Sequence, residues 1–386
     1  TFLHIIHNGG WQYFDAYDRS EEGFDLFNLF NLPSWIGDQF CDPVHHDRLS
    51  CMATGIKFAD RTVTVSPSYA KQIEYQADGL EHILFDVIGI SNAIGKDFKD
   101  KLVARFSKSK FVENNHNKLI DHIKQDKNLY AKISDVYGEI LKGKKEIQAI
   151  EDEKRRYIVT RVYHKLLIQK ERNLMVDPDS ILFSYIHRIT EQKGFQLLLE
   201  ASEGVFKKLK FQGIIGGAIA SGDKKAEEIA HGLYLTSQYY PDQIDLNFGF
   251  QDVSIPLLST DLFLMPSLQE PGGISQLEAF SVGTLVVARA TGGLRDTVFP
   301  IQTLGDDIQG NGFLFSDYSS WSFYDAMERA AFFFNENDDD MIYKARKNAE
   351  NSVYYWDKPA RQYAEKIYNL TETIRLFRDE KGNLID

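Results

Sequence analysis

A glycine-rich loop between an apolar strand and a helix is the segment of this sequence best suited to hold a phosphate. The strand is expected to end at Pro266, the loop carries Gly272 and Gly273, and a helix is expected to begin near Ile274. A helix start presents unpaired backbone N–H groups and the positive end of the helix dipole, and glycines let an anionic ligand approach closely. This pattern indicates a site for a phosphorylated molecule.

Two glutamates stand in this setting, with seven residues between them. Glu270 lies in the loop at the carboxyl end of the strand, where its carboxylate can accept hydrogen bonds from sugar hydroxyls. Glu278 falls about one helical turn inside the helix, within reach of a ribose. A single carboxylate is more often solvated surface, but the glycine loop favours a binding role for both.

A second charged cluster, HRITEQKG at residues 187–194, directly follows the strand-like run ILFSYI. Arg188 and Lys193 would emerge together at the carboxyl edge of a sheet, where two cations suit a diphosphate. The alternative is an ordinary pair of basic surface residues. Two such motifs at strand ends in one domain favour the binding role.

The elements that must position these residues alternate along the chain. From about Ser180 onward, short apolar runs alternate with helical stretches, which is typical of right-handed βαβ units and a parallel sheet with helices on both faces. Residues 176–350 are therefore expected to form a Rossmann-like domain. Residues 1–95 show a second α/β pattern, with runs such as TFLHIIHN and RTVTVSP.

Between these regions, residues 96–175 differ in character. Apolar residues recur at helical spacing, and we expect two long amphipathic helices in a hairpin that turns near Gly143. Positions 96–172 hold 20 lysines and arginines against 12 aspartates and glutamates, a net charge of +8, whereas the rest of the chain carries −20. The segment is interpreted as a solvated helical insertion or as an arm for oligomerisation or partner binding.

Composition excludes several classes of protein. The 386 residues have a net charge of −12, without the basic surplus of a nucleic-acid binder. Two cysteines are too few for a disulfide framework or a four-ligand zinc site, which favours a reducing compartment. No apolar run is long enough to span a membrane and no signal peptide opens the chain, so a cytoplasmic location is expected.

Six segments, in order, resemble the glycogen and starch synthases of bacteria and plants. EPGGISQLEAFSVGTLVVARATGGLRDTV is similar to the family pattern EPCGLxQLxAxxxGTxPVVxxTGGLxDTV, and HRITEQKG is similar to SRLTxQKG. LHIIHNGGWQYF, GIKFADRTVTVSPSYAKQI, VIGISNAIGKDF and NFGFQDVSIPLLSTDLFLMPS resemble four further family segments. The resemblance covers most of the chain outside the helical insertion and the last few residues.

The resemblance implies an α/β fold of two Rossmann-like domains facing a cleft, the GT-B architecture. It implies a retaining glycosyltransferase that takes glucose from a nucleotide-sugar, ADP-glucose or UDP-glucose, and adds it to an α-1,4-glucan. Arg188 and Lys193 would neutralise the donor diphosphate. Glu270 would bind hydroxyls of the transferred glucose, and His7 would contact that sugar from the opposing domain.

Further donor-site roles follow from the same resemblance. Backbone amides of Gly273, Ile274 and Ser275 would hold the distal phosphate. Phe250 stands where the family has a tyrosine that stacks on the nucleobase, and Asn92 should line the same cleft. The remaining expected contacts are the glycine of the phosphate loop, the ribose carboxylate and the turn that shapes the phosphate site: Gly272, Glu278, Thr291, Gly292 and Gly293. No metal ligands and no cofactor besides the donor are expected.

The sequence also departs from the family pattern. Gly272 replaces a cysteine, and NAIG replaces NGID. The family's amino-terminal KTGGL loop and several preceding strands do not occur in this sequence, so residues 1–95 are expected to be the latter part of an incomplete amino-terminal acceptor domain. The segment 351–386 resembles the family's closing helix, and Ala360 to Thr373 are expected to pack back onto the first domain.

Two alternatives to glucan synthesis stay open at this point. One is a retaining glycosyltransferase that acts on another acceptor, favoured by Glu278 and the helical insertion. The other is a degenerate relative with a glucan-binding or regulatory role, favoured by the missing lysine loop.

Overall fold

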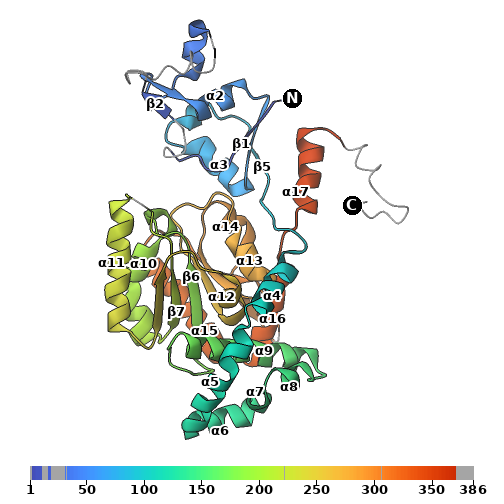
Figure 1. Cartoon of the computed structure of the whole chain (residues 1–386). Coiled ribbons are helices and arrows are strands. Elements are labelled where there is room, and N and C mark those ends of the chain that lie inside the picture. The colour runs from blue at the N-terminus through green and yellow to red at the C-terminus, as the bar shows by residue number, and fades with distance from the viewer. Residues whose placement is uncertain are drawn as a thin grey trace, which may run out of the picture.

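The computed structural model of the chain contains two parallel α/β domains and a helical segment (Figure 1). It describes residues 2–10, 16–18, 31, 33–220, 222–305 and 307–370. The larger domain holds the glycine loop with Glu270 and the charged cluster at residues 187–194. The strand order of its sheet decides which of their side chains meet.

The sheet of the larger domain has six strands in the order β13-β10-β9-β6-β7-β8, and every neighbouring pair is parallel. In chain order this is 3-2-1-4-5-6 read from β8, the order of the doubly wound Rossmann fold. The strands are β6 (Leu182–Ile186), β7 (Gln212–Gly217), β8 (Ile244–Phe248), β9 (Leu262–Met265), β10 (Leu285–Arg289) and β13 (Gly312–Phe315). The direction of winding therefore reverses between β6 and β9, and ligands of such sheets bind at this switch point.

Helices cover both faces of this sheet (Figure 1). One face carries α10 (Phe195–Ser202), which continues as the π-helix η5 (Glu203–Lys208), with α11 (Lys224–Tyr239) and α15 (Ser320–Glu336). The other carries α12 (Ser254–Ser259), α13 (Ser275–Ser281) and α16 (Asp339–Asn351). Shorter elements are η4 (Glu191–Lys193), α14 (Gly292–Thr297) and the hairpin of β11 (Gln302–Leu304) and β12 (Asp307–Gln309).

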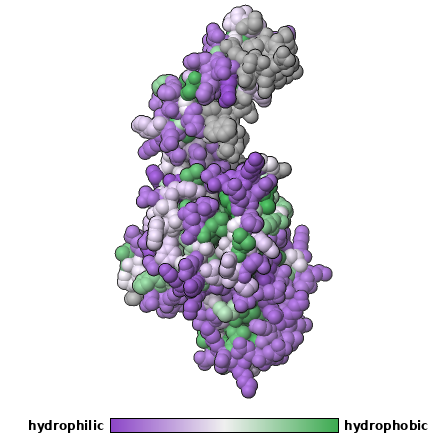
Figure 2. Space-filling view, turned by 90° about the vertical axis from the view of Figure 1, so that its left-hand side faces the viewer, coloured by the Kyte–Doolittle hydropathy of each residue, from purple (hydrophilic) through white to green (hydrophobic). Residues whose placement is uncertain are grey.

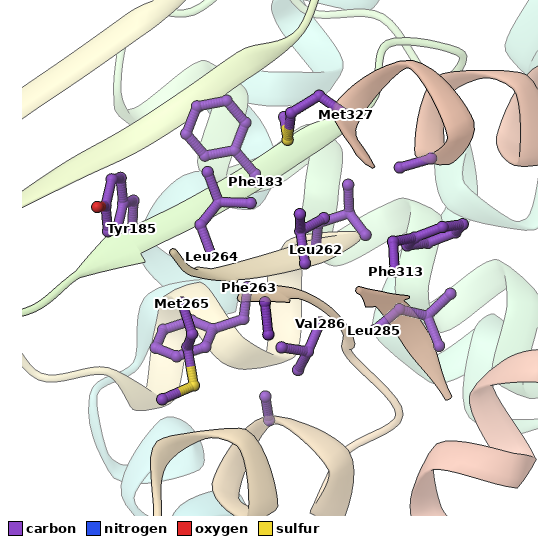
Figure 3. Close-up of a cluster of buried hydrophobic side chains, with 14 of the residues drawn as sticks. Phe183, Tyr185, Leu262, Phe263, Leu264, Met265, Leu285, Val286, Phe313 and Met327 are labelled. Atoms are coloured by element: carbon purple, nitrogen blue, oxygen red, sulfur yellow. The ribbon is translucent and has the colours of Figure 1, made fainter. Parts of the chain in front are cut away.

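The main core lies between the sheet and its helices. Figure 3 shows Phe183, Leu262, Leu264 and Leu285 from neighbouring strands packed together, with Met327 of α15 among them. All residues of β6, β7 and β9 are buried, which is typical of central strands in a parallel sheet covered on both faces. This rigid layer holds the loops at the carboxyl ends of the strands.

The smaller domain has a three-stranded parallel sheet, β1-β4-β5, and an antiparallel pair, β2 with β3. Ser66 accepts a hydrogen bond from the Tyr69 backbone N–H and so caps α3, which starts with proline as N-terminal turns often do. Its elements are β1 (Leu3–Ile6), β2 (Ala16–Asp18), η2 (Ser34–Phe40), β3 (Arg48–Ser50), α2 (Cys51–Phe58), β4 (Arg61–Thr64), α3 (Pro67–Tyr75), η3 (Leu80–His82) and β5 (Ile88–Gly89).

The helical segment corrects the prediction of a two-helix hairpin. It consists of six helices: α4 (Phe98–Lys108), α5 (Phe111–Gln125), α6 (Lys127–Val136), α7 (Gly138–Lys142), α8 (Lys144–Gln148) and α9 (Glu153–Glu171). Asp126 caps a new helix inside the predicted first one, Lys110 has a positive φ, and Gly143 at φ 92° separates α7 from α8. Single-residue breaks of this kind leave the apolar periodicity almost unchanged.

This segment is also more than a solvated insertion. Leu166 and Ile168 of α9 share a buried cluster with Leu182 and Ile214 of the larger sheet, together with apolar residues of α5 and α6. Helix α9 also packs against α12 and α16. It therefore serves as one of the helical layers of the larger domain.

The last described helices return to the smaller domain (Figure 1). Helix α17 (Asp357–Gln362) continues as the π-helix η6 (Tyr363–Ile367), and Ile367 is buried with Val63 and Ile90 of the smaller domain. Residues 371–373 of the predicted crossing segment lie outside the described residues.

Most of the surface on the α11 side is hydrophilic, with apolar side chains gathered in patches on the larger domain (Figure 2). Within the described ranges, no helix has the length and apolar composition needed to cross a bilayer.

Candidate functional site

The glycine loop after β9 and the charged cluster at residues 187–194 after β6 meet at the switch point of the larger sheet. Lys193 follows β6, Glu270 follows β9, and Lys193 Nζ donates to Glu270 Oε2 at 2.6 Å. Both side chains are largely buried, with 19% and 12% of their surface exposed. Because an ammonium has three donors and Glu270 uses only one oxygen in this bond, both groups keep hydrogen-bonding capacity for a ligand.

Two further bonds hold the loops that carry these residues together. The backbone N–H of Leu268 donates to the Gln192 carbonyl at 2.8 Å, and the Gln192 side chain donates to the Gln269 carbonyl at 3.0 Å. The Tyr185 hydroxyl donates to the Lys193 carbonyl at 2.7 Å. The ion pair is therefore built on fixed backbone.

Arg188 is exposed at the same edge and forms no ion pair with any residue that the structure describes. Its neighbour His187 is partly buried, and desolvation of its ring together with the nearby Lys193 charge lowers the imidazole pKa to about 4. The neutral ring donates from Nε2 to the Leu264 carbonyl at 2.9 Å. His187 thus ties the Arg188 backbone to β9, while the Arg188 guanidinium is available for an anion.

The predicted TGG turn lies directly against the glycine loop. The Gly293 N–H donates to the carbonyls of Glu270 and Pro271, both at 3.0 Å. A Cβ atom on Gly293 would lie 2.1 Å from the Gly272 carbonyl oxygen, so only glycine allows this approach. Gly292 adopts a positive φ of 44°. The turn therefore holds the backbone of the glycine loop in place.

The glycine loop leads into α13 as the sequence predicts. Gly273 has a φ of 60°, Ile274 is the residue before the first turn, and Ser275 begins the helix. Glu278 lies in the first turn and is partly buried. Burial raises the pKa of the Glu278 carboxyl, and the positive charge of Arg105 partly opposes that rise.

The smaller domain contacts this loop directly. The Ser66 hydroxyl donates to the Pro271 carbonyl at 2.5 Å. Asp296 of α14 accepts from the backbone N–H and the hydroxyl of Ser68 at 2.9 and 2.5 Å, a favourable place for a carboxylate because it is the start of α3. These bonds fix the two domains against each other beside the site.

Asn92, which follows β5, reaches the glycine loop from the smaller domain. A Cβ atom on Gly272 would lie 2.6 Å from Asn92 Nδ2. This close approach gives a physical reason why glycine replaces the cysteine of the family pattern at this position.

The outlying predicted residues are His7 and Phe250. His7 is exposed at the carboxyl end of β1, and Phe250 follows β8 with 98% of its surface exposed. Their positions at strand ends fit the predicted roles, but the structure shows neither in contact with the Lys193–Glu270 pair.

Tyr69 joins the domains and was missed by sequence reasoning. Its hydroxyl accepts from the Gly9 N–H at 2.7 Å and from the Gln269 side chain at 3.2 Å. The ring is fully buried, so the sequence pattern shows only a core aromatic on an amphipathic helix. The segment SPSYAKQI carries it, but nothing in that pattern singles out the hydroxyl.

Beside this contact lies an interdomain cavity of about 530 Å³. Gly9, Gly10 and Ser68 line it from the smaller domain, and Thr291 and Arg295 line it from the larger domain. Its mixed polar lining suits a hydroxyl-rich molecule.

Comparison with known proteins agrees with this geometry. A family model described as starch synthase catalytic domain matches residues 1–86, and one described as glycosyl transferases group 1 matches residues 168–348. A glycogen synthase of Thermosipho africanus is 30% identical over 95% of this chain and 65% of its own length. A glycogen synthase of Exiguobacterium sibiricum is 32% identical over 74% of this chain and 50% of its own length. The chain thus spans half to two thirds of these relatives.

Solved structures show the same fold. The catalytic domain of starch synthase IV from Arabidopsis thaliana, bound to ADP and acarbose, matches 96% of this chain and 67% of its own with a TM-score of 0.65 and 21% identity. Sucrose-phosphate synthase from Thermosynechococcus elongatus matches with a TM-score of 0.50 and 16% identity, over 96% of this chain and 68% of its own.

Two parallel α/β domains in contact beside a charged switch point define the GT-B class of glycosyltransferases. Within that class, the chain is similar to the glycogen and starch synthases over almost its whole length.

Proposed function

We propose that the protein is a retaining glycosyltransferase that moves glucose from ADP-glucose or UDP-glucose to the non-reducing end of an α-1,4-glucan. The main observation in support of this proposal is the Lys193–Glu270 pair at the switch point, with Arg188 exposed beside it. The glycogen synthases among its relatives, and the ADP and acarbose held by the starch synthase structure, support this choice of donor and acceptor.

In this proposal the cations act on the leaving group. Negative charge develops on the donor diphosphate as its bond to glucose breaks, and the guanidinium of Arg188 and the ammonium of Lys193 stabilise it. Because these two groups supply the charge that a divalent metal would otherwise provide, we propose transfer without a metal or other cofactor. Backbone amides at Gly273, Ile274 and Ser275 would receive the distal phosphate.

Glu270 would orient the sugar. Its Oε1 can accept hydrogen bonds from glucose hydroxyls while Oε2 stays bonded to Lys193 and to the Ser267 hydroxyl at 3.1 Å. The interdomain cavity near Gly9 and Arg295 is our proposed entry for the acceptor chain. A cytoplasmic location is likewise proposed, supported by the low cysteine count of two, with neither cysteine in a disulfide.

The test is nucleoside diphosphate release and chain elongation by the full-length protein, with glycogen and each nucleotide-glucose. We expect turnover with at least one donor, and a Glu270→Gln variant that stays folded but loses activity by about 10²–10³-fold. Glu200→Gln, which changes an exposed glutamate of α10, is the matched control and should remain active.

Two results would redirect the proposal. Turnover of neither donor would refute it. Nucleoside diphosphate release without glucan elongation would instead show a retaining glycosyltransferase that uses another acceptor.

A further inference from the structure

The start of α3 crosses the boundary between the two domains beside the site. Helix α3 belongs to the smaller domain, and it packs against α14 of the larger domain (Figure 1). Three residues at its start, Ser66, Ser68 and Tyr69, form hydrogen bonds with the larger domain. The position of this turn therefore sets how the Glu270 loop lies relative to the smaller domain.

Two of these bonds hold the residues on either side of Glu270. The Gln269 side chain donates to the Tyr69 hydroxyl at 3.2 Å. The Ser66 hydroxyl donates to the Pro271 carbonyl at 2.5 Å. Ser66 Oγ also accepts from the Tyr69 N–H at 3.2 Å, which fixes these two residues relative to each other. Because both neighbours of Glu270 are anchored, its backbone is held against the smaller domain.

The Tyr69 hydroxyl also holds the segment that carries His7. Gly9 lies two residues after His7, and its N–H donates to this hydroxyl at 2.7 Å. A Cβ atom on Gly9 would lie 3.3 Å from the same oxygen, so the backbone runs close against it. The Tyr69 ring is fully buried, and close packing of the core gives its hydroxyl a defined position. One oxygen atom thus connects the His7 segment with the Glu270 loop.

We propose that Tyr69 is a positioning residue for glucose transfer, whose hydroxyl holds the His7 segment and the Glu270 loop at a fixed separation so that both contact the same glucose. This inference rests on the proposed function, because it concerns the sugar end of the same site. Tyr69 acts through Gly9 and Gln269 and does not itself touch the sugar.

The effect of losing the hydroxyl follows from the alignment of these two segments. Misplacement of a binding group by about 1 Å can lower a rate by about 10²-fold. Tyr69→Phe keeps the ring but removes the partner that Gly9 and Gln269 share. Arg188 and Lys193, which are assigned to the diphosphate, follow β6 and are held by other hydrogen bonds. The substitution should therefore impair sugar transfer more than binding of the nucleoside diphosphate.

The experiment compares Tyr69→Phe with the wild type in the full-length protein. Turnover is measured with glycogen and each nucleotide-glucose, ADP and UDP are titrated by calorimetry, and Tm is recorded. We expect kcat to fall about 10- to 100-fold while the Kd of the diphosphate stays within about twofold. Tyr163→Phe is the matched control, because Tyr163 is also buried and its hydroxyl pairs with His116 Nδ1 at 2.8 Å in the helical segment. It should lower Tm without lowering kcat.

Gln269→Met tests the same route without changing a core residue. Gln269 is half-buried, and methionine keeps its length but cannot donate to Tyr69. We expect kcat to fall about three- to tenfold, the usual worth of one hydrogen bond. In this background Tyr69→Phe should have a smaller effect, because both substitutions break the same bond.

Several outcomes would overturn the inference and leave the proposed function intact. These are an unchanged kcat in folded Tyr69→Phe, an equal fall in Tyr163→Phe, a parallel loss of diphosphate affinity, or fully multiplicative effects of Tyr69→Phe and Gln269→Met. If Tyr69→Phe does not fold, an unchanged kcat in Gln269→Met overturns the inference and a lowered kcat with unchanged diphosphate affinity supports it. Turnover of neither nucleotide-glucose by the wild type would overturn both.

Discussion

Asp261 is buried at the amino-terminal ends of strands β6 and β9, whereas the donor site lies at the carboxyl-terminal ends of the strands. Its carboxylate accepts from Arg346 Nη2 at 2.7 Å, from Lys165 Nζ at 3.1 Å and from the Leu182 N–H at 3.0 Å. Burial by itself raises the pKa of Asp261, but the positive charges of Lys165 and Arg346 outweigh it and hold the pKa below its usual value. The group is therefore ionised in the folded protein.

Asp261→Asn keeps the shape of this side chain and removes its charge. Lys165 and Arg346, both less than a tenth exposed, would then be buried without a counter-charge. Removing one partner of a buried ion pair costs about 3–5 kcal/mol, and we expect the free energy of unfolding to fall by that amount. Against a typical total of about 5–15 kcal/mol, such a loss should leave the variant marginally stable.

A surface carboxylate with the same kind of partners provides the control. Asp340 pairs with Lys154 at 2.6 Å and with Lys344 at 3.0 Å, but 38% of its side-chain surface is exposed. Water and salt screen such pairs, so Asp340→Asn should unfold close to the wild type. Burial is the main difference between the two substitutions.

Urea unfolding followed by circular dichroism measures both variants. The folded pKa of Asp261 lies below its unfolded value of about 3.9. Its contribution should accordingly be complete above pH 5 and should shrink as the pH falls below about 4. A loss for Asp261→Asn no larger than that for Asp340→Asn at pH 7 would refute the reasoning.

The remaining predictions concern the site. Lys193→Gln should lower kcat/KM by about 10²–10³-fold in a variant that stays folded; unfolding of the variant would show a structural role instead. Gly293→Ala should lower kcat/KM for the donor by about 10²-fold, since its Cβ would displace the Gly272 carbonyl, whereas Gly138→Ala, with open space around it, should behave as the wild type. Activity should be unchanged in excess EDTA, and a loss restored by Mg²⁺ or Mn²⁺ would contradict the proposed role of the two cations.

Local sequence patterns predicted the elements that carry the site. Short apolar runs predicted β6 and β9, and Pro266, Gly272 and Gly273 predicted the loop before α13, because these signals depend on residues a few positions apart. The same locality explains the error in the helical segment. An apolar stripe continues across a break, so the capping side chain of Asp126 and the positive φ at Lys110 escaped notice.

Long-range relations required the tertiary structure. Lys193 and Glu270 lie 77 residues apart, and each is only a charged residue after a strand until β6 and β9 become neighbours. The hydroxyl of Tyr69, the approach of Asn92 to Gly272, and the reach of Arg105 to Asp252 depend in the same way on which elements pack together.

The sequence by itself thus determined the fold class, the glycine loop and the chemical types available to bind a phosphorylated sugar. The tertiary structure decided which of those groups meet, because strand order in a sheet is set by burial of apolar surface along the whole domain, and no short segment of sequence contains that information.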